Sequence, residues 1–341
     1  MDFAAFKSTY RERIEATQFL VEQTNKSSVL VIQQFPTARD TEILLPAVRE
    51  SISNVIAFVE LGDLETLKHA IEDADGTFDA IAMDSDVKHE HSRALIDYVK
   101  NAVTKTKIFY YSDTSVWAES ALTFVQNIES GLKDKNILVT GAGILLAKLL
   151  NNLSDYGANL FHLPGPDPVQ DVLLSAVSAG GSSKTFRVID DSSDLSRIDL
   201  VIGASIKQVS ADDALAERLP QGINIYDMGI GNFSEDFIVA ARARGQQMYR
   251  LDNRAGISSM VLSLFETDYL ISKMMGSVCI KDVHLVSGGI LGPKGAIIVD
   301  NVYQPTHVIG IADGKGRVNF TPETEKENDD LQFVNRLIAA I

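Results

Sequence analysis

The sequence has a single cysteine and no apolar run of the roughly 18 residues that a membrane-spanning helix needs. A lone cysteine, Cys279, excludes an intramolecular disulfide, which fits a reducing compartment. The apolar neighbours of Cys279 predict that it packs in the core. The first 23 residues mix charges at helical spacing without an uninterrupted apolar stretch, so no signal peptide is predicted. We therefore expect a cytoplasmic protein.

Basic residues are scarce as well. The chain has 31 Lys and Arg against 46 Asp and Glu, and its formal net charge is −15. Nucleic acids and anionic membranes are bound by clustered Lys and Arg, so neither partner is expected. Zinc-type cysteine patterns and a P-loop are missing, and His89 and His91 have the wrong spacing for a helical metal site. The sequence predicts no metal, and a small-molecule substrate is the expected partner.

The 341 residues suffice for more than one domain. After an amphipathic helix over 3–24, apolar strands alternate with helices, which predicts parallel sheets covered on both faces. The strands predicted in this first set are 28–35, 54–61, 78–85 and 107–113. The helices predicted between them are 41–52, 64–74 and 91–103.

A long helix over 115–130 is predicted to connect the first set to a second alternating set. The second set is expected to begin with a strand and a glycine turn over 136–143. Its further strands are expected at 159–163, 186–190, 198–205, 223–229 and 246–252. The helices of this set are expected at 144–157, 234–245 and 255–275. Segment 276–320 has short strands between Gly- and Pro-rich turns, and a helix over 331–341 follows.

The predicted fold class is α/β, with two parallel-sheet α/β domains joined by a bridging helix, the second domain a Rossmann fold, and a small C-terminal antiparallel β appendage. The predicted domains are 1–114 for substrate and catalysis, 115–275 for the bridging helix, the nucleotide and the returning helix, and 276–341 for the appendage. Short hairpins are not stable alone, so the appendage is expected to pack or to pair with a second subunit. A homodimer is our prediction.

The turn Gly141-Ala142-Gly143 lies between a predicted strand and a predicted helix. In Rossmann domains the first glycine makes the tight turn, and the second lets the backbone approach a pyrophosphate. Leu146 replaces the third glycine of the usual pattern. The next strand ends in Leu163-Pro164-Gly165 without an acidic residue or an arginine for the ribose, and Asp167 is the nearest acid. The turn therefore predicts a site for NAD or NADP, and the alternative is a Rossmann domain that no longer binds a dinucleotide.

Four short motifs accompany this order of elements: YSDTSVWAESAL, DLVIGAS, INIYDMGIGNFS and YRLDNRAGISSM. With them, residues 28–275 resemble the superfamily of amino-acid dehydrogenase-like Rossmann proteins, of the shikimate dehydrogenase, methylene-tetrahydrofolate dehydrogenase, dipicolinate synthase A and pyrrolysine synthase type. The leading helix and the glycine-rich entry to the last helix look most like pyrrolysine synthase. The segment 276–320 departs from all of them.

The resemblance implies a catalytic pair. Lys88 follows the third predicted strand, and Asp113 precedes the bridging helix. Such a pair holds a substrate hydroxyl or amine and moves a proton while hydride passes to or from a nicotinamide. The alternatives are that Lys88 is a solvated loop charge and that Asp113 is the N-cap of the bridging helix.

Further site residues follow from the ends of the predicted strands. Those predicted to bind NAD or NADP are Gly141, Ala142, Gly143, Ile144, Leu163, Gly203, Ala204, Ser205, Met228, Gly229 and Gly256. Those predicted to contact the substrate are Ser112, Arg254, Ser258 and Ser259. Arg254 is expected to hold a substrate carboxylate, and the alternative is that it pairs with Asp252. The loop 228–234 follows another predicted strand and is expected to face the nicotinamide ring. The alternative for its Ser234 is that this residue only caps the helix that follows.

The leading hypothesis is an NAD(P)-dependent oxidoreductase that acts on a small polar metabolite, such as an amino acid, an imine or a hydroxy acid, in the cleft between the domains. A second hypothesis keeps the fold but assigns non-redox chemistry of the cyclohydrolase or lyase type. A third is a non-catalytic sensor or assembly subunit.

Overall fold

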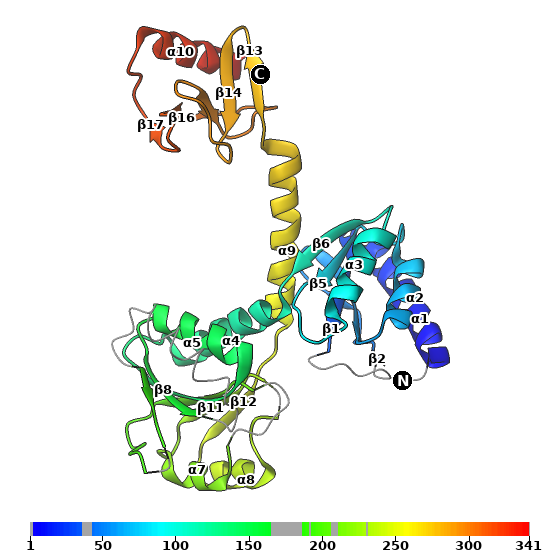
Figure 1. The fold of residues 1–341 in the computed structure, drawn as a ribbon, viewed down its shortest axis with the longest axis vertical. Helices are drawn as coiled ribbons and strands as arrows, with labels where there is room; N and C mark the ends of the chain where they lie inside the picture. The colour runs from blue at the N-terminus through cyan, green and yellow to red at the C-terminus, as the bar shows by residue number, and fades with distance from the viewer. Residues whose placement is uncertain are drawn as a thin grey trace. The chain divides into compact units, whose positions relative to one another are not determined.

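The computed structural model describes residues 3–35, 43–164, 186–190, 192–205, 211–229 and 231–340. The chain divides into two compact units, Met1–Val261 and Leu262–Ile341. The first unit contains two sheets and the second unit one smaller sheet (Figure 1). The boundary between the units lies inside the helix predicted over 255–275. The three-domain division stays a prediction.

The first sheet has the strand order β2-β4-β1-β5-β6, with β3 beside β4. Its strands are β1 (Ser27–Gln34), β2 (Ile43–Leu44), β3 (Arg49–Glu50), β4 (Asn54–Leu61), β5 (Ala80–Asp84) and β6 (Lys107–Tyr111). Its helices are α1 (Phe3–Thr24), α2 (Leu64–Ala74) and α3 (Ser92–Ala102). β4, β1, β5 and β6 run parallel, as predicted, whereas β2 and β3 run antiparallel to β4.

The helix predicted over 41–52 is wrong. Over its described part the chain is extended and forms β2 and β3. Pro46 explains the error, because a proline inside a helix lacks the N–H donor and clashes with the carbonyl four residues earlier. Proline also favours an extended residue before it, here Leu45. Arg49 therefore lies on a strand, β3, and not on a helix.

The helices of the first sheet pack on it through one apolar cluster. Phe6 and Tyr10 of α1 are fully buried there beside Leu30 and Ile32 of β1. The hydroxyl of Tyr10 donates to the carbonyl of Ala70 at 3.0 Å, which ties α1 to α2. The buried hydroxyl thus has a partner and the layer is fixed.

The second sheet has the strand order β12-β11-β10-β7-β8-β9, and all its strands run parallel. Its strands are β7 (Asn136–Gly141), β8 (Asn159–Pro164), β9 (Phe186–Val188), β10 (Leu200–Gly203), β11 (Asn224–Asp227) and β12 (Gln247–Arg250). Numbered along the chain from β7, this is the 3-2-1-4-5-6 order of a Rossmann fold. The predicted Rossmann fold is confirmed.

Helices cover both faces of the second sheet (Figure 1). α4 (Asp113–Glu129) and α5 (Gly143–Asp155) share an apolar cluster on one face. α7 (Asp213–Arg218) and α8 (Glu235–Ala243) pack on the other face. α7 was not predicted, although Asp212 caps it by accepting from the Leu215 N–H at 3.3 Å. Ser234 caps α8, as the alternative to a site role had it.

The helix α9 (Arg254–Tyr269) ends in a π-helical turn, η1 (Leu270–Met274). The sheet of the second unit then has the order β13-β14-β15-β16-β17. Its strands are β13 (Ser277–Ile280), β14 (Val283–Ser287), β15 (Ile297–Val299), β16 (Val308–Ala312) and β17 (Val318–Asn319). Its pairs are antiparallel, as predicted, except for the parallel pair β14–β15. α10 (Glu325–Ala339) packs on this sheet and begins at a capping box of Thr324 and Glu327, earlier than the predicted 331.

The prediction for Cys279 is wrong, because this thiol is exposed. Its neighbours Val278 and Ile280 pack against the core of the second unit instead. Side chains alternate between the two faces along a strand, so an apolar stretch on an edge strand still exposes every second residue. Because β13 is such an edge strand, Cys279 faces away from the core.

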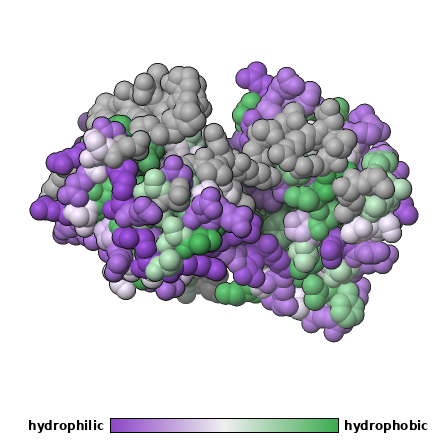
Figure 2. Space-filling model, turned by 90° about the horizontal axis from the view of Figure 1, so that it is seen from below, coloured by the Kyte–Doolittle hydropathy of each residue, from purple (hydrophilic) through white to green (hydrophobic). Residues whose placement is uncertain are grey.

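Among the described residues, no helix combines the length and the apolar character needed to cross a membrane. Hydrophilic residues predominate among the coloured atoms of the face drawn in Figure 2, and hydrophobic residues form smaller groups. Apolar residues make up most of the buried residues and fill the sheet–helix layers.

Candidate active site

Polar side chains gather at the carboxyl end of the first sheet. In the parallel order β4-β1-β5-β6, connections leave in opposite directions from β1 and β5, and open α/β sheets bind ligands at such a point. Gln33 and Gln34 end β1, Asp84 ends β5, and Asp113 begins α4. Lys88 follows β5 by four residues. All lie within the first unit.

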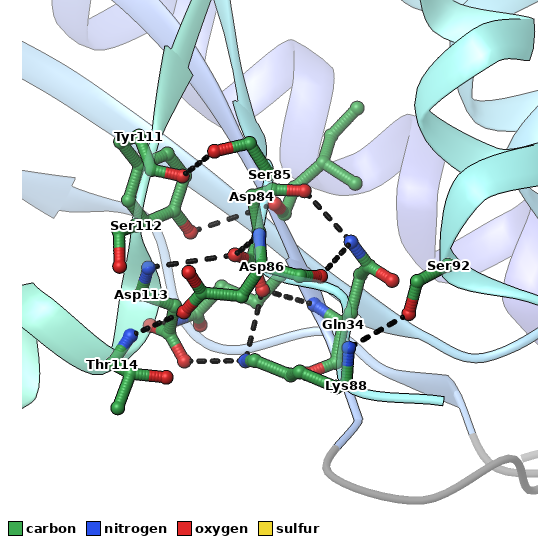
Figure 3. Close-up of polar contacts among 12 residues, drawn as sticks. Gln34, Asp84, Ser85, Asp86, Lys88, Ser92, Tyr111, Ser112, Asp113 and Thr114 are labelled. Atoms are coloured by element: carbon green, nitrogen blue, oxygen red, sulfur yellow. Dashed lines mark hydrogen bonds and ion pairs between the residues drawn. The ribbon is translucent and has the colours of Figure 1, made fainter. Parts of the chain in front are cut away.

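The ammonium group of Lys88 lies between the carboxylates of Asp113 and Asp84 (Figure 3). Its Nζ donates to Asp113 Oδ2 at 2.7 Å and to the carbonyl oxygen of Gln34 at 3.0 Å, and it lies 2.8 Å from Asp84 Oδ2. The side chain is only 11% exposed. Burial lowers the pKa of Lys88, but Asp113 and Asp84 outweigh burial and raise it. Lys88 is thus held as an ammonium ion.

Asp84 is the fully buried member of the cluster, with a side-chain exposure of 0%. Its Oδ1 accepts from the N–H groups of Asp86 at 3.0 Å and Asp113 at 3.4 Å, and its Oδ2 accepts from the N–H of Gln34 at 3.3 Å. Burial raises the pKa of Asp84 to about 6, Lys88 lowers it, and Asp113 raises it. Every donor around this carboxylate comes from an element that also forms the site.

Asp113 lies in the first turn of α4, where the helix dipole favours negative charge. Its Oδ1 accepts from Gln33 Nε2 at 3.0 Å, and its Oδ2 pairs with Lys88. The N-cap of α4 is Ser112, so the alternative that Asp113 is the cap is wrong. The alternative of a solvated Lys88 is wrong as well, since both side chains are about nine-tenths buried. Their catalytic role stays a prediction.

A pocket of about 800 Å³ opens beside this cluster within the first unit. Four of the predicted site residues line it, namely Lys88, Asp113, Gly229 and Arg254. Other lining residues are Gln33, Gln34, Leu44, Pro46, Arg49, Glu60, Thr114, Trp117, Arg250, Leu251, Asp252 and Asn253. The pocket thus joins the ends of β1 and β4, the start of α4 and the segment after β12.

The predicted substrate residues fall into two groups. Arg254 lines the pocket, but its guanidinium pairs with Asp252. This pairing was the predicted alternative to binding a substrate carboxylate. Ser112, Ser258 and Ser259 are outside the described lining of the pocket. Ser112 Oγ caps α4 and accepts from Lys148 Nζ at 2.9 Å, which ties α4 to α5. Ser258 and Ser259 lie on the first turns of α9, and Ser259 is exposed.

The glycine turn after β7 has the backbone that its sequence predicts. Gly141 has φ +117°, and a Cβ there would lie 2.6 Å from Ser205 Oγ. Gly143 has φ +89°, and a Cβ there would meet nothing within 4 Å. The first glycine therefore makes the tight turn, and open space lies at the second. Ile144, the next residue of α5, is 53% exposed.

One amide of this turn is used internally. The N–H of Ala142 donates to Ser205 Oγ at 2.9 Å, and the N–H of Ser205 donates to Asn232 Oδ1 at 2.6 Å. Ser205 was predicted as a cofactor residue, whereas its hydroxyl here fixes the turn to the end of β10. The amides left for a ligand are those of the first turn of α5.

The remaining predicted cofactor residues pack tightly around the turn. A Cβ at Gly203 would lie 2.6 Å from Asn232 Cβ, and one at Gly229 would collide with the carbonyl of Ser205. A Cβ at Gly256 would collide with Ser120 Oγ, so this glycine permits close packing of α9 on α4. Ala204 and Met228 are fully buried, and Leu163 packs on the core from a half-buried position.

Of the two departures from the dinucleotide pattern, the structure describes the one at Leu146. Leu146 is 2% exposed and packs in the core between α5 and the sheet, where the third glycine would stand. Gly165 and Asp167, which follow β8, lie outside the described residues.

Sequence reasoning missed several residues of the site, namely Gln33, Gln34, Asp84 and Arg49. No signal in the sequence singled out the two glutamines. Asp84 was counted only as part of a strand, although a charge that ends an apolar stretch (AIAMD) was its signal. Arg49 was placed on a helix, and Pro46 was the signal against that helix. Both Asp84 and Arg49 now lie at the polar cluster or in its pocket.

No known protein family matches the sequence, and no curated protein does. Similar solved structures include a shikimate dehydrogenase in complex with NADP+, with 12% identity, coverage of 70% of this chain and 96% of that one, and a TM-score of 0.43. A quinate dehydrogenase from Corynebacterium glutamicum in complex with NAD has 14% identity, coverage of 71% and 93%, and a TM-score of 0.40. The catalytic subunit of M. jannaschii aspartate transcarbamoylase has 10% identity, coverage of 78% and 97%, and a TM-score of 0.42. The first two are of the type that the sequence resemblance named.

Proposed function

We propose that this protein is an NAD(P)-dependent oxidoreductase that acts on a small polar metabolite in the pocket between the end of the first sheet and the end of β12. The observation that carries the proposal is the buried ion pair of Lys88 and Asp113 at the wall of that pocket. The pocket volume of about 800 Å³ is within the usual range for a small-molecule site.

The two side chains have different chemical roles. Lys88 is an ammonium ion with two carboxylates beside it, so it donates hydrogen bonds and supplies positive charge but is a poor base. Asp113 accepts hydrogen bonds from Gln33 through Oδ1 and from Lys88 through Oδ2. It is the carboxylate partner of Lys88, and it lines the pocket. Asp113 accepts or returns the proton of a substrate hydroxyl or amine. Lys88 holds the Asp113 carboxylate in place beside that group and supplies positive charge there.

The second sheet fits the phosphate end of a dinucleotide. The open space at Gly143 and the first amides of α5 would hold a pyrophosphate, with Gly141 making the turn. Gly229, at the end of β11, lines the same pocket as Asp113. When bound, the nicotinamide supplies or takes a hydride.

Calorimetric titration with NAD(H) and NADP(H) tests this proposal. We expect saturable binding of one of them to the wild-type protein and its loss in Gly143→Asp, which puts a negative charge where the phosphates would lie. Gly222→Asp is the matched control, because Gly222 also has a positive φ (+71°) and open space around it but lies before β11. Absence of binding to the wild-type protein would overturn the proposal.

A second function is favoured by the hydrogen bond from the Ala142 N–H to Ser205 Oγ, which removes one amide from phosphate binding. It is non-redox chemistry of the cyclohydrolase or lyase type at the same Lys88–Asp113 pair. Turnover that needs no added or co-purified nicotinamide would favour it. A homodimer and a cytoplasmic location stay predictions.

A further inference from the structure

We infer that Arg49 is an anion anchor that binds the carboxylate of the substrate, so the substrate is a small hydroxy or amino acid. This inference rests on the proposed function in one respect: the same pocket must be the substrate site. It extends the proposal by naming the charged group of the substrate and the residue that recognises it.

The guanidinium of Arg49 is held in place by the first sheet. Arg49 lies on β3, opposite Ile56 of β4 in the antiparallel register. Its Cζ stands 4.8 Å from the centre of the Phe58 ring, two residues further along β4 and thus on the same face. Stacking of this kind orients a guanidinium and leaves its edge for a planar partner. Arg49 also lines the pocket that contains Lys88 and Asp113.

One nitrogen of this guanidinium lacks an acceptor. The Nη1 atom of Arg49 is shielded from solvent and has no hydrogen-bond partner. Burial lowers the pKa of Arg49, the nearby charge of Asp252 raises it, and that of Arg254 lowers it. A buried cationic donor without an acceptor is unfavourable, and an incoming carboxylate would relieve this cost.

The other charges of the pocket indicate why the ligand should be a carboxylate. Lys88 is matched by Asp113 and Asp84, and Arg254 is matched by Asp252. Glu60 and Arg250 also line the pocket. Arg49 takes no part in the two sets of ion pairs above, and its planar guanidinium is matched in shape and charge by a carboxylate. A hydroxyl or amine on the same small molecule would then reach the Lys88–Asp113 pair. This combination is that of a hydroxy acid or an amino acid.

The experiment is a binding assay without nicotinamide and without turnover, so its result is independent of the redox proposal. The probes are 2-hydroxy and 2-amino carboxylates from lactate and alanine upward in size, each paired with its neutral primary amide, and inorganic phosphate. Binding is measured by titration calorimetry and by the NMR shifts of the arginine side chains. We expect at least one carboxylate to bind on the order of tenfold more tightly than its amide.

Arg49→Met is expected to remove that difference by weakening the carboxylate on the order of tenfold while the amide binds as before. Arg49→Lys keeps the positive charge but lacks the planar guanidinium, so its preference for the carboxylate over the amide should be intermediate. This variant provides the test if Arg49→Met does not fold. Arg93→Met, which alters an exposed arginine on α3, is the matched control and should bind like the wild type. Four outcomes would each overturn the inference. They are equal binding of every acid and its amide, unchanged carboxylate binding in Arg49→Met, no binding of any probe, and tighter binding of phosphate than of any carboxylate. Carboxylate binding through Arg49 in a protein that binds no nicotinamide would instead overturn only the redox proposal.

Discussion

The carboxyl ends of the two parallel sheets differ in what they present to a ligand. The first sheet ends in ionised side chains, with Asp84, Lys88 and Asp113 paired and largely buried. The second sheet ends in Gly141, Gly143 and their neighbours, where the backbone itself forms the surface. Because both ends are edges of the same kind of sheet, the difference comes from the residues alone. One edge is suited to proton transfer, and the other to close approach by a phosphate.

The two edges also differ in what stabilises them. Buried charges are tolerated only when partners surround them, which explains the three N–H donors and the ammonium around Asp84. The glycine turn needs space and positive φ angles instead, and one hydroxyl, that of Ser205, secures it. Changes at the first edge should therefore affect charge and pH dependence, and changes at the second should act through collision.

The largest effect is expected for Asp113→Asn, which keeps the shape of the side chain but removes its charge and its capacity to accept a proton. Loss of a general acid–base group lowers kcat/KM by roughly 10²- to 10⁴-fold. Steady-state kinetics with the substrate found by the binding panel measure this loss. Asp97→Asn, which alters an exposed carboxylate on α3, is the control and should keep full activity. A drop of less than threefold in Asp113→Asn would assign Asp113 to structure only.

Asp84→Asn should change how stability depends on pH. The folded protein holds the pKa of Asp84 near 6, above the usual 3.8, so it binds this proton more tightly than the unfolded chain does. Stability from this group is present below pH 3.8 and is lost as pH rises through 6. Relative to the variant, the wild-type protein should lose up to about 3 kcal/mol of unfolding free energy between pH 4 and pH 7. Urea titrations at a series of pH values measure this, and parallel curves for the two proteins would contradict it.

The smallest effect is expected at the second edge. Gly229→Ala places a methyl group against the carbonyl of Ser205 and should cost about 2 kcal/mol of unfolding free energy. In Gly231→Ala, in the same loop, the added methyl group would meet open space, and only the positive φ (+82°) disfavours alanine. The loss of unfolding free energy should therefore be about 1 kcal/mol. Thermal or urea unfolding of the two variants gives the comparison. If Gly231→Ala were the more damaging, collision would not govern this edge.

The sequence predicts the layers of this protein well. Apolar stretches predict the strand 54–61 and the helix 64–74 with the bounds that the structure has, because burial against a helix layer depends mainly on the pattern of apolar residues. The helix over 41–52 fails because its apolar spacing is outweighed by one residue, Pro46. Cys279 fails because an edge strand exposes one of its faces, and a sequence does not state which strand lies at the edge.

The site is predicted less completely than the fold. Lys88 and Asp113 are predicted from the resemblance, and their positions after strand ends agree with it, because such ends meet at one edge of a sheet. Asp84 joins them only through its contacts with Lys88 in the folded chain. Ser205 lies where predicted, at the end of β10, but its hydroxyl accepts from the turn. The hydrogen-bond partners of Asp84 and Ser205 are set by distances in the folded chain, and these distances cannot be derived from the spacing of residues along the sequence.

The surroundings of Lys88 have one more consequence. Its three N–H bonds all have acceptors, on Asp113, Asp84 and Gln34, so the nitrogen retains no lone pair for attack on a carbonyl carbon. A ketone or aldehyde in the pocket would thus be polarised by Lys88 without becoming bonded to it. Lysines that form a Schiff base are kept neutral by burial or by a neighbouring cation, and this one lies between two anions. We therefore expect no Schiff base between Lys88 and a substrate carbonyl.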